Sequence, residues 1–483
     1  MTIQKDAIAA ISTPLGSGGI AVIRVSGSTA IEIVDKVFRG SVRLIAADSH
    51  KVYWGKIIMP NGIPPDKGST NRVDQNSNLL DEVVVTVFRA PQSYTRENVV
   101  EISCHGGAFL TKTILELLLK QGARLAEPGE FTLRAFLNGR FDLAQAEAVA
   151  DMIRAKTDLS LKAALSQFQG TFSQRIKQIR QKLIDVCSLL ELELDFAEED
   201  VEFAEKREVK NRLNAIINEV EDFANSYKKG KILREGAKLV IIGKPNVGKS
   251  SLLNALLKEE RAIVTEVPGT TRDTLEEQLN IAGVLFRVVD TAGVRDTQEV
   301  VEREGVSRTL MQIKEADIIL FLFDASNILE PYDTELINQV LSLRGKAVNS
   351  MNGIVAVINK IDLEKKISNH DLLKKLGRCP ILEISAKYHL GLKGLEDALI
   401  EASLGKMNIA RNEPVVTNIR QKQAFDRALG SLKLALKSLE KGLSSEFIAL
   451  DLRASLQSLG EIIGEVTTED ILANIFSKFC IGK

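Results

Sequence analysis

Cysteine is scarce in this sequence, and its placement excludes a common kind of metal site. The four cysteines among 483 residues are Cys104, Cys187, Cys379 and Cys480. They lie far apart and no pair has CxxC spacing, so no zinc site is expected. The pattern is typical of reduced thiols in a cytoplasmic protein.

Long apolar runs are also absent. No stretch of about 18 apolar residues occurs, so no membrane-spanning helix is expected. The first residues, MTIQKDAIAAISTPLG, do not combine a basic start with a long apolar run, so we expect no signal peptide. Together these absences predict a cytoplasmic protein without a membrane partner.

An excess of charge of either sign is missing too. Lys and Arg number 63 and Asp and Glu 64, which gives a net charge of −1. A nucleic-acid partner therefore requires a local basic patch or a helper protein. The 45% of apolar and 26% of charged residues are typical of a soluble globular protein.

The length of the chain is too great for one hydrophobic core, and about three domains are expected. We predict a multidomain α/β plus all-α fold. Residues 1–138 are expected to form an α+β domain, and residues 234–405 an α/β domain. The helical residues 139–233 and 406–483 are expected to form the two halves of one discontinuous domain.

The first domain shows strands before helices. A glycine-rich turn at 16–19 separates its first two strands, and the polar residues 64–81 are expected to form a mobile loop. Strands are predicted at 7–13, 19–27 and 81–90, and a helix at 110–119.

The α/β domain contains short, almost continuous apolar runs separated by helical stretches. Such runs are typical of parallel strands buried on both faces, and they predict a doubly wound sheet. The five runs are 237–243, 285–290, 317–324, 353–360 and 381–385.

Both helical segments carry apolar stripes with helical spacing, and neither is long enough for an independent core. We therefore expect them to pack on each other, with the α/β domain inserted between them as a lever. The acidic run 191–203 is expected to be a solvated helix end. The stripes are Ile176, Ile179, Leu183, Val186 and Leu190, then Phe425, Leu429, Leu432, Leu436 and Leu439, then Ile471, Leu472, Ile475, Phe476 and Phe479.

The sequence GKPNVGKS at 243–250 predicts a phosphate-binding loop, because it follows one predicted strand and opens a helix at Lys249. Its glycines allow the backbone N–H groups to approach phosphates closely. We expect Lys249 to reach the β- and γ-phosphates and Ser250 to bind Mg²⁺.

Four more motifs follow in order, and all five together are specific for GTP. GTTRD (269–273) supplies Thr271 as a second Mg²⁺ ligand, and DTAG (290–293) supplies Asp290 and the Gly293 N–H. In NKID (359–362), Asp362 accepts hydrogen bonds from the paired donors of guanine. SAK (385–387) ends the last strand at the same sheet edge.

The motifs predict a Ras-like P-loop GTPase domain. The predicted GTP-binding residues are Asn246, Val247, Gly248, Lys249, Ser250, Ser251, Thr265, Glu266, Val267, Pro268, Gly269, Thr270, Thr271, Asp290, Thr291, Ala292, Gly293, Asn359, Lys360, Asp362, Ser385, Ala386 and Lys387.

Val294, directly after DTAG, cannot orient the attacking water as a glutamine does in many GTPases. Hydrolysis therefore requires another polar residue, a cation or a partner chain. Glu302, Glu304, Arg272 and Arg295 are the nearby candidates, and each is otherwise an ordinary surface charge.

Several further stretches carry a resemblance. They are SYTRENVVEISCHGG (93–107), EPGEFTLRAFLNGRFDLAQAEAVADMI (127–153), ELELDFAEEDV (191–201) and EVTTEDILANIFSKFCIGK (465–483). With these and the nucleotide motifs, the chain resembles the MnmE (TrmE) family of tRNA modification GTPases over almost its whole length, except for the loop at 64–81. The ending FCIGK is the most specific part.

This resemblance implies a GTPase that helps to add a carboxymethylaminomethyl-type group to carbon 5 of the wobble uridine of certain tRNAs. It implies a homodimer that forms a heterotetramer with an FAD-dependent partner, MnmG (GidA-like). A 5-formyl- or methylene-tetrahydrofolate is expected in the N-terminal domain. Its contacts map onto Arg24, Glu101, Arg140 and Lys483; the alternative for Arg24 and Glu101 is a surface ion pair.

The resemblance also implies a K⁺ ion beside the nucleotide, held by Asn246, Thr265, Val267 and Thr270. Hydrolysis would then depend on two GTPase domains meeting face to face. Glu302 matches the family's residue that orients the attacking water, which makes it the first choice among the nearby candidates. With it, Lys249 and Arg272 are the predicted catalytic residues.

Cys480 has two interpretations, a functional thiol near the folate and uridine or a small apolar member of the last helical stripe. Two alternative functions also stay open at this point. One is a regulatory switch of the ribosome-assembly type, without modification chemistry of its own. The other is a folate-dependent aminomethyl transferase.

Overall fold

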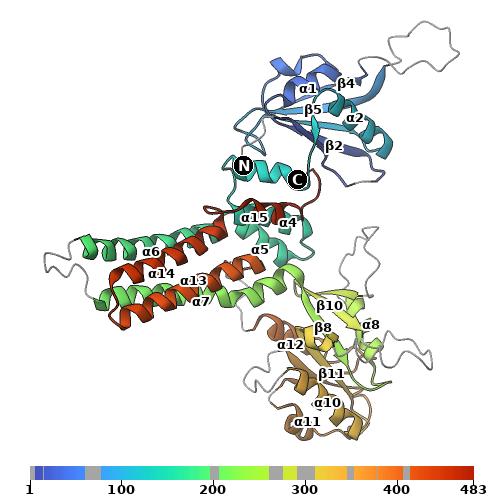
Figure 1. The fold of residues 1–483 in the computed structure, drawn as a ribbon. Coiled ribbons are helices and arrows are strands. Elements are labelled where there is room, and N and C mark those ends of the chain that lie inside the picture. Colours follow the sequence, from blue (N-terminus) through green and yellow to red (C-terminus); the bar gives the residue numbers. More distant parts are fainter. Residues whose placement is uncertain are drawn as a thin grey trace. The chain divides into compact units, whose positions relative to one another are not determined.

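The computed structural model describes residues 6–14, 16–59, 78–195, 206–259, 276–290, 311–344, 353–377, 379–405 and 414–482. The chain divides into two compact units. The N-terminal unit comprises Met1–Ala150 and Gly460–Lys483, and the central unit comprises Asp151–Leu459 (Figure 1). Within the described ranges, no helix has both the length and the apolarity needed to cross a membrane.

The N-terminal unit is built on a seven-stranded sheet in which only the β1–β7 pair is parallel. The three predicted strands correspond to β1, β2 and β5, and the predicted helix to α2 (Ala108–Lys120). The spatial order is β3 (Phe38–Gly40), β4 (Lys51–Ile58), β5 (Leu79–Phe88), β6 (Val99–His105), β2 (Ile20–Ser26), β1 (Ile8–Ile11) and β7 (Arg124–Leu125).

Alternation along these strands gives the sheet two different faces. The helices α1 (Ala30–Val37) and α2 cover one face and enclose an aliphatic core that includes Val25, Val85 and Ile102. Near β1, the opposite face is covered by Phe131 of α3 (Glu130–Leu137), which packs with Ile8 and Ala10. Farther out this second face stays open: on neighbouring strands, Trp54 is 62% exposed and lies opposite the exposed Val84.

The last residues of the chain belong to this unit and run beside its first strands. Helix α15 (Glu469–Phe476) contacts α3, and the buried Phe476 and Phe479 rings pack together. Gly129 has a left-handed conformation with a φ of +70°, and a Cβ atom there would lie 2.6 Å from the Phe476 carbonyl oxygen. Both features require glycine at this position. The Gly482 carbonyl then accepts hydrogen bonds from the Ser12 hydroxyl and the Arg24 guanidinium, at 3.2 and 3.4 Å.

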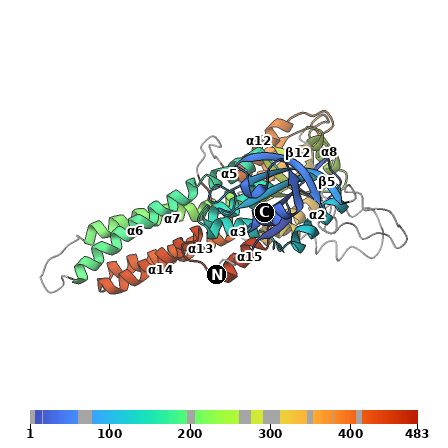
Figure 2. The same ribbon diagram turned by 90° about the horizontal axis from the view of Figure 1, so that it is seen from above.

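The helical part of the central unit confirms that the two helical segments pack on each other. Figures 1 and 2 show α6, α7 and α13 running side by side, with α14 alongside. Phe172, Phe223 and Phe425, from both segments, form one aromatic cluster with centroids 5.4 to 6.3 Å apart. The helices are α5 (Asp158–Phe168), α6 (Thr171–Asp195), α7 (Lys206–Glu235), α13 (Ile419–Glu440) and α14 (Ser445–Ile463).

The inserted part of the central unit has the predicted doubly wound sheet. All neighbouring strands are parallel except β9, which pairs antiparallel with β10. The five predicted strands are confirmed, whereas the polar edge strand β9 was not predicted. The order is β13 (Ile381–Glu383), β12 (Ile354–Asn359), β11 (Ile318–Asp324), β8 (Ala237–Ile242), β10 (Val284–Asp290) and β9 (Glu276–Ile281).

Separate hydrophobic cores cover the two faces of this sheet. The helices that provide them are α8 (Lys249–Glu259), α10 (Pro331–Arg344), α11 (Asn369–Leu376) and α12 (Leu392–Leu404). In the acidic run, α6 continues to Asp195, and residues 196–203 lie outside the described residues.

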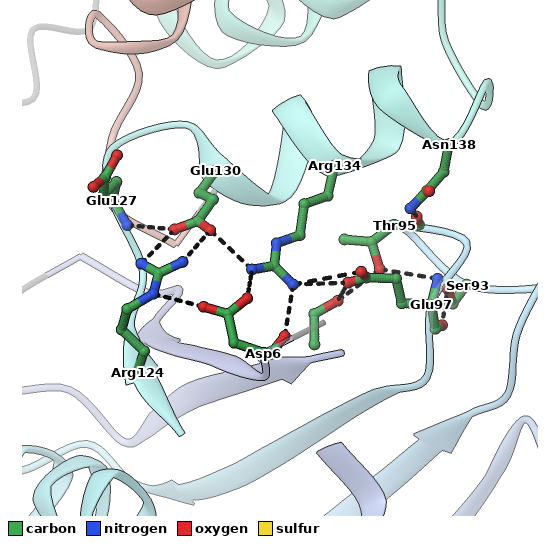
Figure 3. Close-up of polar contacts among 10 residues, drawn as sticks. Asp6, Ser93, Thr95, Glu97, Arg124, Glu127, Glu130, Arg134 and Asn138 are labelled. Atoms are coloured by element: carbon green, nitrogen blue, oxygen red, sulfur yellow. Dashed lines mark hydrogen bonds and ion pairs between the residues drawn. The ribbon is translucent and has the colours of Figure 1, made fainter. Parts of the chain in front are cut away.

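A network of charged side chains fixes α3 to the start of the chain (Figure 3). Arg134, whose side chain is only 5% exposed, donates to the Asp6 carboxylate at 2.7 Å and to Glu130 at 2.9 Å, and it lies 3.4 Å from Glu97. Arg124 pairs with Asp6 and Glu130 as well. Burial opposes ionisation of both Asp6 and Glu130, but the hydrogen bonds from the two arginines outweigh it and hold the pKa of each carboxyl below its usual value.

We predict that Arg134→Met destabilises the N-terminal unit by about 3 kcal/mol, because it removes the nearly buried cation that pairs with Asp6, Glu97 and Glu130 and leaves Arg124 to pair with Asp6 and Glu130 alone. Urea unfolding can be followed by the fluorescence of Trp54, the single tryptophan of the chain. Since the folded pKa values of Asp6 and Glu130 are depressed, the wild-type network stabilises the fold above about pH 4 and loses this contribution as the pH falls through the folded values. The variant should therefore show a weaker loss of stability than the wild type between about pH 5 and pH 3.

Lys112→Met is the matched control for Arg134→Met, because Lys112 makes only an exposed i,i+4 pair with Glu116. That pair is worth at most about 0.5 kcal/mol. Equal destabilisation by the two substitutions would contradict the role given to the network.

Candidate functional site

The phosphate loop lies between β8 and α8, and its shape requires its glycines. Gly248 has a φ of +100°, and a Cβ atom there would lie 2.3 Å from the Asn359 amide nitrogen. A Cβ atom on Gly243 would lie 2.3 Å from the Leu322 carbonyl oxygen. The Lys249 ammonium donates to the carbonyl oxygens of Gly243 and Lys244, both at 2.8 Å. It therefore lies at the loop that is predicted to bind the phosphates.

The Asn359 side chain joins this loop to two other predicted motifs. Its amide nitrogen donates to the Val247 carbonyl at 2.9 Å, and its amide oxygen accepts from the Ala386 backbone N–H at 3.0 Å. Asn359 is only 2% exposed, so both bonds are shielded from water. The structure thus brings together the predicted residues of 246–251, 359–362 and 385–387.

Two further contacts shape the base-binding end of this site. The Ser385 hydroxyl donates to one Asp362 carboxylate oxygen at 2.6 Å and so fixes the orientation of that carboxylate. The Lys360 ammonium pairs with Asp324 at 2.6 Å. Burial raises the pKa of Asp324, but the hydrogen bonds from Lys360 and Ser326 outweigh it and the pKa lies below its usual value. The sequence reasoning missed Asp324, although this residue ends the apolar run 317–324 at the same sheet edge.

Of the remaining predicted nucleotide residues, Asp290 lies within the described part of the chain. The backbone of Asp290 ends β10 and lies in register with Ile241 of the adjacent strand β8. The other predicted residues lie outside the described residues: Thr265, Glu266, Val267, Pro268, Gly269, Thr270, Thr271, Arg272, Thr291, Ala292, Gly293 and Glu302, together with Val294, Arg295 and Glu304. Their roles stay predictions.

A second site, a cleft of about 660 Å³, opens on the second face of the N-terminal sheet. It contains three of the four predicted folate contacts, Arg24, Glu101 and Arg140. The fourth, Lys483, lies outside the described residues. The cleft is also lined by His50, Phe88, Pro91, Gln92, Ser93, Tyr94, Arg96 and Val99, which were not predicted individually; Ser93 to Val99 belong to the stretch 93–107 that carries the resemblance.

Two arginines flank one aromatic ring in this cleft. The guanidinium groups of Arg24 and Arg140 each lie 5.1 Å from the Tyr94 ring centroid. Arg24 also pairs with Glu101 at 2.7 Å, because the two residues are opposite each other on β2 and β6. The predicted alternative of an ion pair is therefore present, although both side chains are mostly shielded, at 13% and 27% exposure.

The cleft carries net positive charge. Burial, and after it the positive charges of Arg96 and Arg24, lower the pKa of Arg140. Arg140 also donates to the Ser93 carbonyl at 2.8 Å, which fixes its position. Three arginines and one glutamate line the cleft, so it suits a ligand that bears carboxylates.

Cys480 differs from the other cysteines. Cys104, Cys187 and Cys379 are buried, and burial raises the pKa of Cys379; burial and the nearby Asp81 raise the pKa of Cys104 to about 11. Cys480 is exposed, so its interpretation as a member of the buried apolar stripe is wrong. Its role as a functional thiol stays a prediction.

The sheet order, the phosphate loop and the base-site contacts define a P-loop GTPase domain inserted into a helical segment. The pattern of the MnmE helical domain matches residues 143–480, and that of the N-terminus of the GTP-binding protein TrmE matches residues 7–140. The chain belongs to the MnmE family, which confirms the predicted resemblance and fold class.

Full-length relatives agree with this assignment. The protein named tRNA modification GTPase MnmE from Acetivibrio thermocellus is 43% identical over 482 residues, which cover 99% of this chain and 100% of the relative. Relatives with the same name from Thermoanaerobacter pseudethanolicus and Carboxydothermus hydrogenoformans are each 44% identical, and the alignments cover at least 99% of both chains. Among solved structures, the G domain of the T. maritima FeoB iron transporter matches 34% of this chain at 24% identity, with a TM-score of 0.26.

Proposed function

We propose that this chain is a GTP hydrolase that acts in tRNA modification and helps to install a carboxymethylaminomethyl-type group on carbon 5 of wobble uridine. The observation that carries the proposal is the joining of the phosphate loop, the NKID motif and the SAK motif by Asn359. This arrangement lies in a chain that matches tRNA modification GTPases over its full length.

In the proposed hydrolysis, each predicted catalytic or Mg²⁺-binding residue has a defined task. The Lys249 ammonium exchanges its two carbonyl partners for phosphate oxygens, because both lie at the same loop. Asp362, oriented by Ser385, accepts from the guanine donors. Ser250 and Thr271 would hold Mg²⁺, which would supply positive charge to the phosphates. Glu302 orients the water that attacks the γ-phosphorus, with Arg272 as a nearby cation. The bond from the γ-phosphorus to the bridging oxygen breaks, and GDP and phosphate leave.

The experiment that tests this function is nucleoside analysis of tRNA from cells that lack the chain. We predict that wobble uridines lose the carbon-5 group and that wild-type protein restores it. Lys249→Ala should not restore it, whereas Lys258→Ala, a matched change at an exposed position on the same helix, should. Unchanged wobble uridines would instead favour the regulatory switch without modification chemistry. We expect modification in vitro to require the FAD-dependent partner as well, in a heterotetramer with this chain.

We further propose that K⁺ binds beside the nucleotide and that the chain acts as a homodimer. Asn246 is exposed in the phosphate loop, with a φ of +63°, and its amide supplies the kind of oxygen ligand that suits an alkali cation. Thr265, Val267 and Thr270 are the other proposed ligands. The open face around Trp54 and Val84 offers an apolar surface to a second copy.

We predict that GTP hydrolysis is faster in K⁺ than in Na⁺ by about tenfold or more, because Na⁺ is too small to bridge the same ligands and phosphates. The rate per chain should also rise with protein concentration, as expected when two GTPase domains must meet. The measurement is steady-state phosphate release at matched ionic strength. Equal rates in both cations would contradict the proposed potassium site. A rate per chain that does not change with protein concentration would contradict the proposed dimer contact.

The N-terminal cleft is proposed to bind a 5-formyl- or methylene-tetrahydrofolate, which supplies the one-carbon unit when bound. The charged arginines suit the glutamyl carboxylates, Glu101 can accept from pterin N–H groups, and Tyr94 offers a ring for stacking. Lys483 follows Gly482, whose carbonyl already lies at Arg24. Cys480 is proposed as the thiol that serves the same chemistry.

We predict that Arg140→Met weakens binding of 5-formyl-tetrahydrofolate by about tenfold or more, because a charge-assisted hydrogen bond is worth about 1.5 to 3 kcal/mol. Isothermal titration calorimetry on the full chain measures this. Arg39→Met, at an exposed position on β3 and outside the cleft lining, should bind like the wild type. If the wild type fails to bind at about millimolar ligand, the folate proposal is wrong.

A further inference from the structure

A cleft of about 390 Å³ in the central unit has a strong excess of positive charge. Its lining includes Arg154, Lys156, Arg234 and Arg287, against one acidic residue, Glu235. The whole chain has a net charge of only −1. The cations are therefore concentrated locally. A nearly neutral protein needs such a local basic patch to attract a negatively charged partner.

Four separate segments bring these side chains together. Arg154 ends α4 (Leu143–Arg154), Lys156 precedes α5, and Arg234 lies in the last turn of α7. Arg287 lies on β10 directly opposite Gln278 of β9, so these two side chains share one face of the hairpin. The Lys156 ammonium donates to the Gln278 amide oxygen at 3.1 Å, which joins the α4–α5 connection to the hairpin.

Two of the four cations, Lys156 and Arg287, have no ion-pair partner among the described residues. Arg234 pairs with Asp151 at 2.8 Å, but the partner of Lys156 is a neutral amide. The Nε atom of Arg287 is buried and has no hydrogen-bond partner among the described residues. A buried donor left unsatisfied costs about 1 to 3 kcal/mol, so negative charge bound in the cleft close to this guanidinium would be favoured.

The chemistry of the lining selects among anions. It contains no aromatic side chain on which a base could stack, and its apolar residues are leucines. Guanidinium groups match phosphate oxygens in geometry. The preceding turns of α7 add Lys228, Lys229 and Lys231, all exposed or half-exposed, so the basic surface continues beyond the cleft. Such an extended surface suits the repeated phosphates of an RNA backbone, which proteins read largely through phosphate and sugar contacts in double-helical regions.

We propose that this cleft, with the adjoining end of α7, binds backbone phosphates of tRNA. The proposal rests on the proposed function in tRNA modification and assigns part of the RNA contact to named residues. It also connects the RNA to the nucleotide site, because β10 continues from Arg287 to Asp290 at the edge that carries the phosphate loop. The turn of the same hairpin packs on α5, where a Cβ atom on Gly283 would lie 2.9 Å from Leu159.

The test is the affinity of the full chain for fluorescently labelled tRNA, measured by anisotropy over a range of KCl concentrations. We expect Lys156→Glu to weaken binding about tenfold and to reduce the slope of log K against log salt by about 1. Lys156 is exposed, so the fold should tolerate the change. Arg287→Gln, which keeps a polar side chain and removes the charge, should also weaken binding.

Lys375→Glu is the matched control. Lys375 is exposed on α11 and lies outside the cleft lining, and its substitution changes the net charge by the same amount as Lys156→Glu. It should leave both the affinity and the salt slope near the wild-type values. GTP hydrolysis without RNA should be unchanged in Lys156→Glu, which verifies that the GTPase domain is folded.

The outcomes separate this inference from the proposed function. If the wild type binds tRNA and Lys156→Glu and Arg287→Gln bind it equally well, the inference is overturned while the function stands. If Lys156→Glu instead weakens only the complex with the FAD-dependent partner, the cleft is a protein interface and the RNA assignment is wrong. If the wild type does not bind tRNA at all, both the inference and direct RNA contact by this chain fail.

Discussion

One buried amide, that of Asn359, holds the nucleotide site in a single geometry. The strands β8, β12 and β13 end at the same sheet edge, but the loops that follow them are free to diverge. Asn359 uses its donor on the loop after β8 and its acceptor on the loop after β13. An aspartate at this position would lack the donor and a leucine would lack both groups. The distance between the phosphate end and the base end of the site is thereby fixed before any ligand arrives.

The N-terminal unit depends on a different constraint, the charged network around Arg134. Helix α3 carries Glu130 and Arg134, and the network joins this helix to Asp6, near the start of the sequence. Gly129, at the start of the same helix, allows the close approach of the last helix and its tail. The network therefore supports the N-terminal cleft indirectly, since the tail that it helps to position supplies the Gly482 carbonyl at Arg24.

The sequence predicted the parts of the fold that local pattern determines. Apolar runs located the five parallel strands, because strands buried on both faces tolerate few polar residues. The strand β9, with the sequence EEQLNI, has no such run, since an edge strand keeps one side toward solvent, and it was missed. The phosphate loop and the NKID and SAK motifs were predictable because each follows a recognisable strand.

The clefts were less predictable, because their residues meet only in three dimensions. Arg24 and Glu101 were named from the family resemblance, but Tyr94, whose ring lies 5.1 Å from the guanidinium groups of both Arg24 and Arg140, was not. Arg134 and Asp6 are 128 positions apart, and no local pattern relates them. The basic cleft of the central unit draws its cations from four segments, and the balanced net charge of the chain conceals it.

The position of the C-terminal tail has a consequence for the order in which the protein matures during synthesis. Residues 460–482 belong to the same compact unit as residues 1–150, so this unit is completed only after residues 460–482 have left the ribosome. The nucleotide site has no such requirement, since all its segments precede residue 405. A nascent or prematurely terminated chain could thus handle GTP before it could seat a ligand beside Arg24. Both sites are therefore present only in a chain that extends through residue 482.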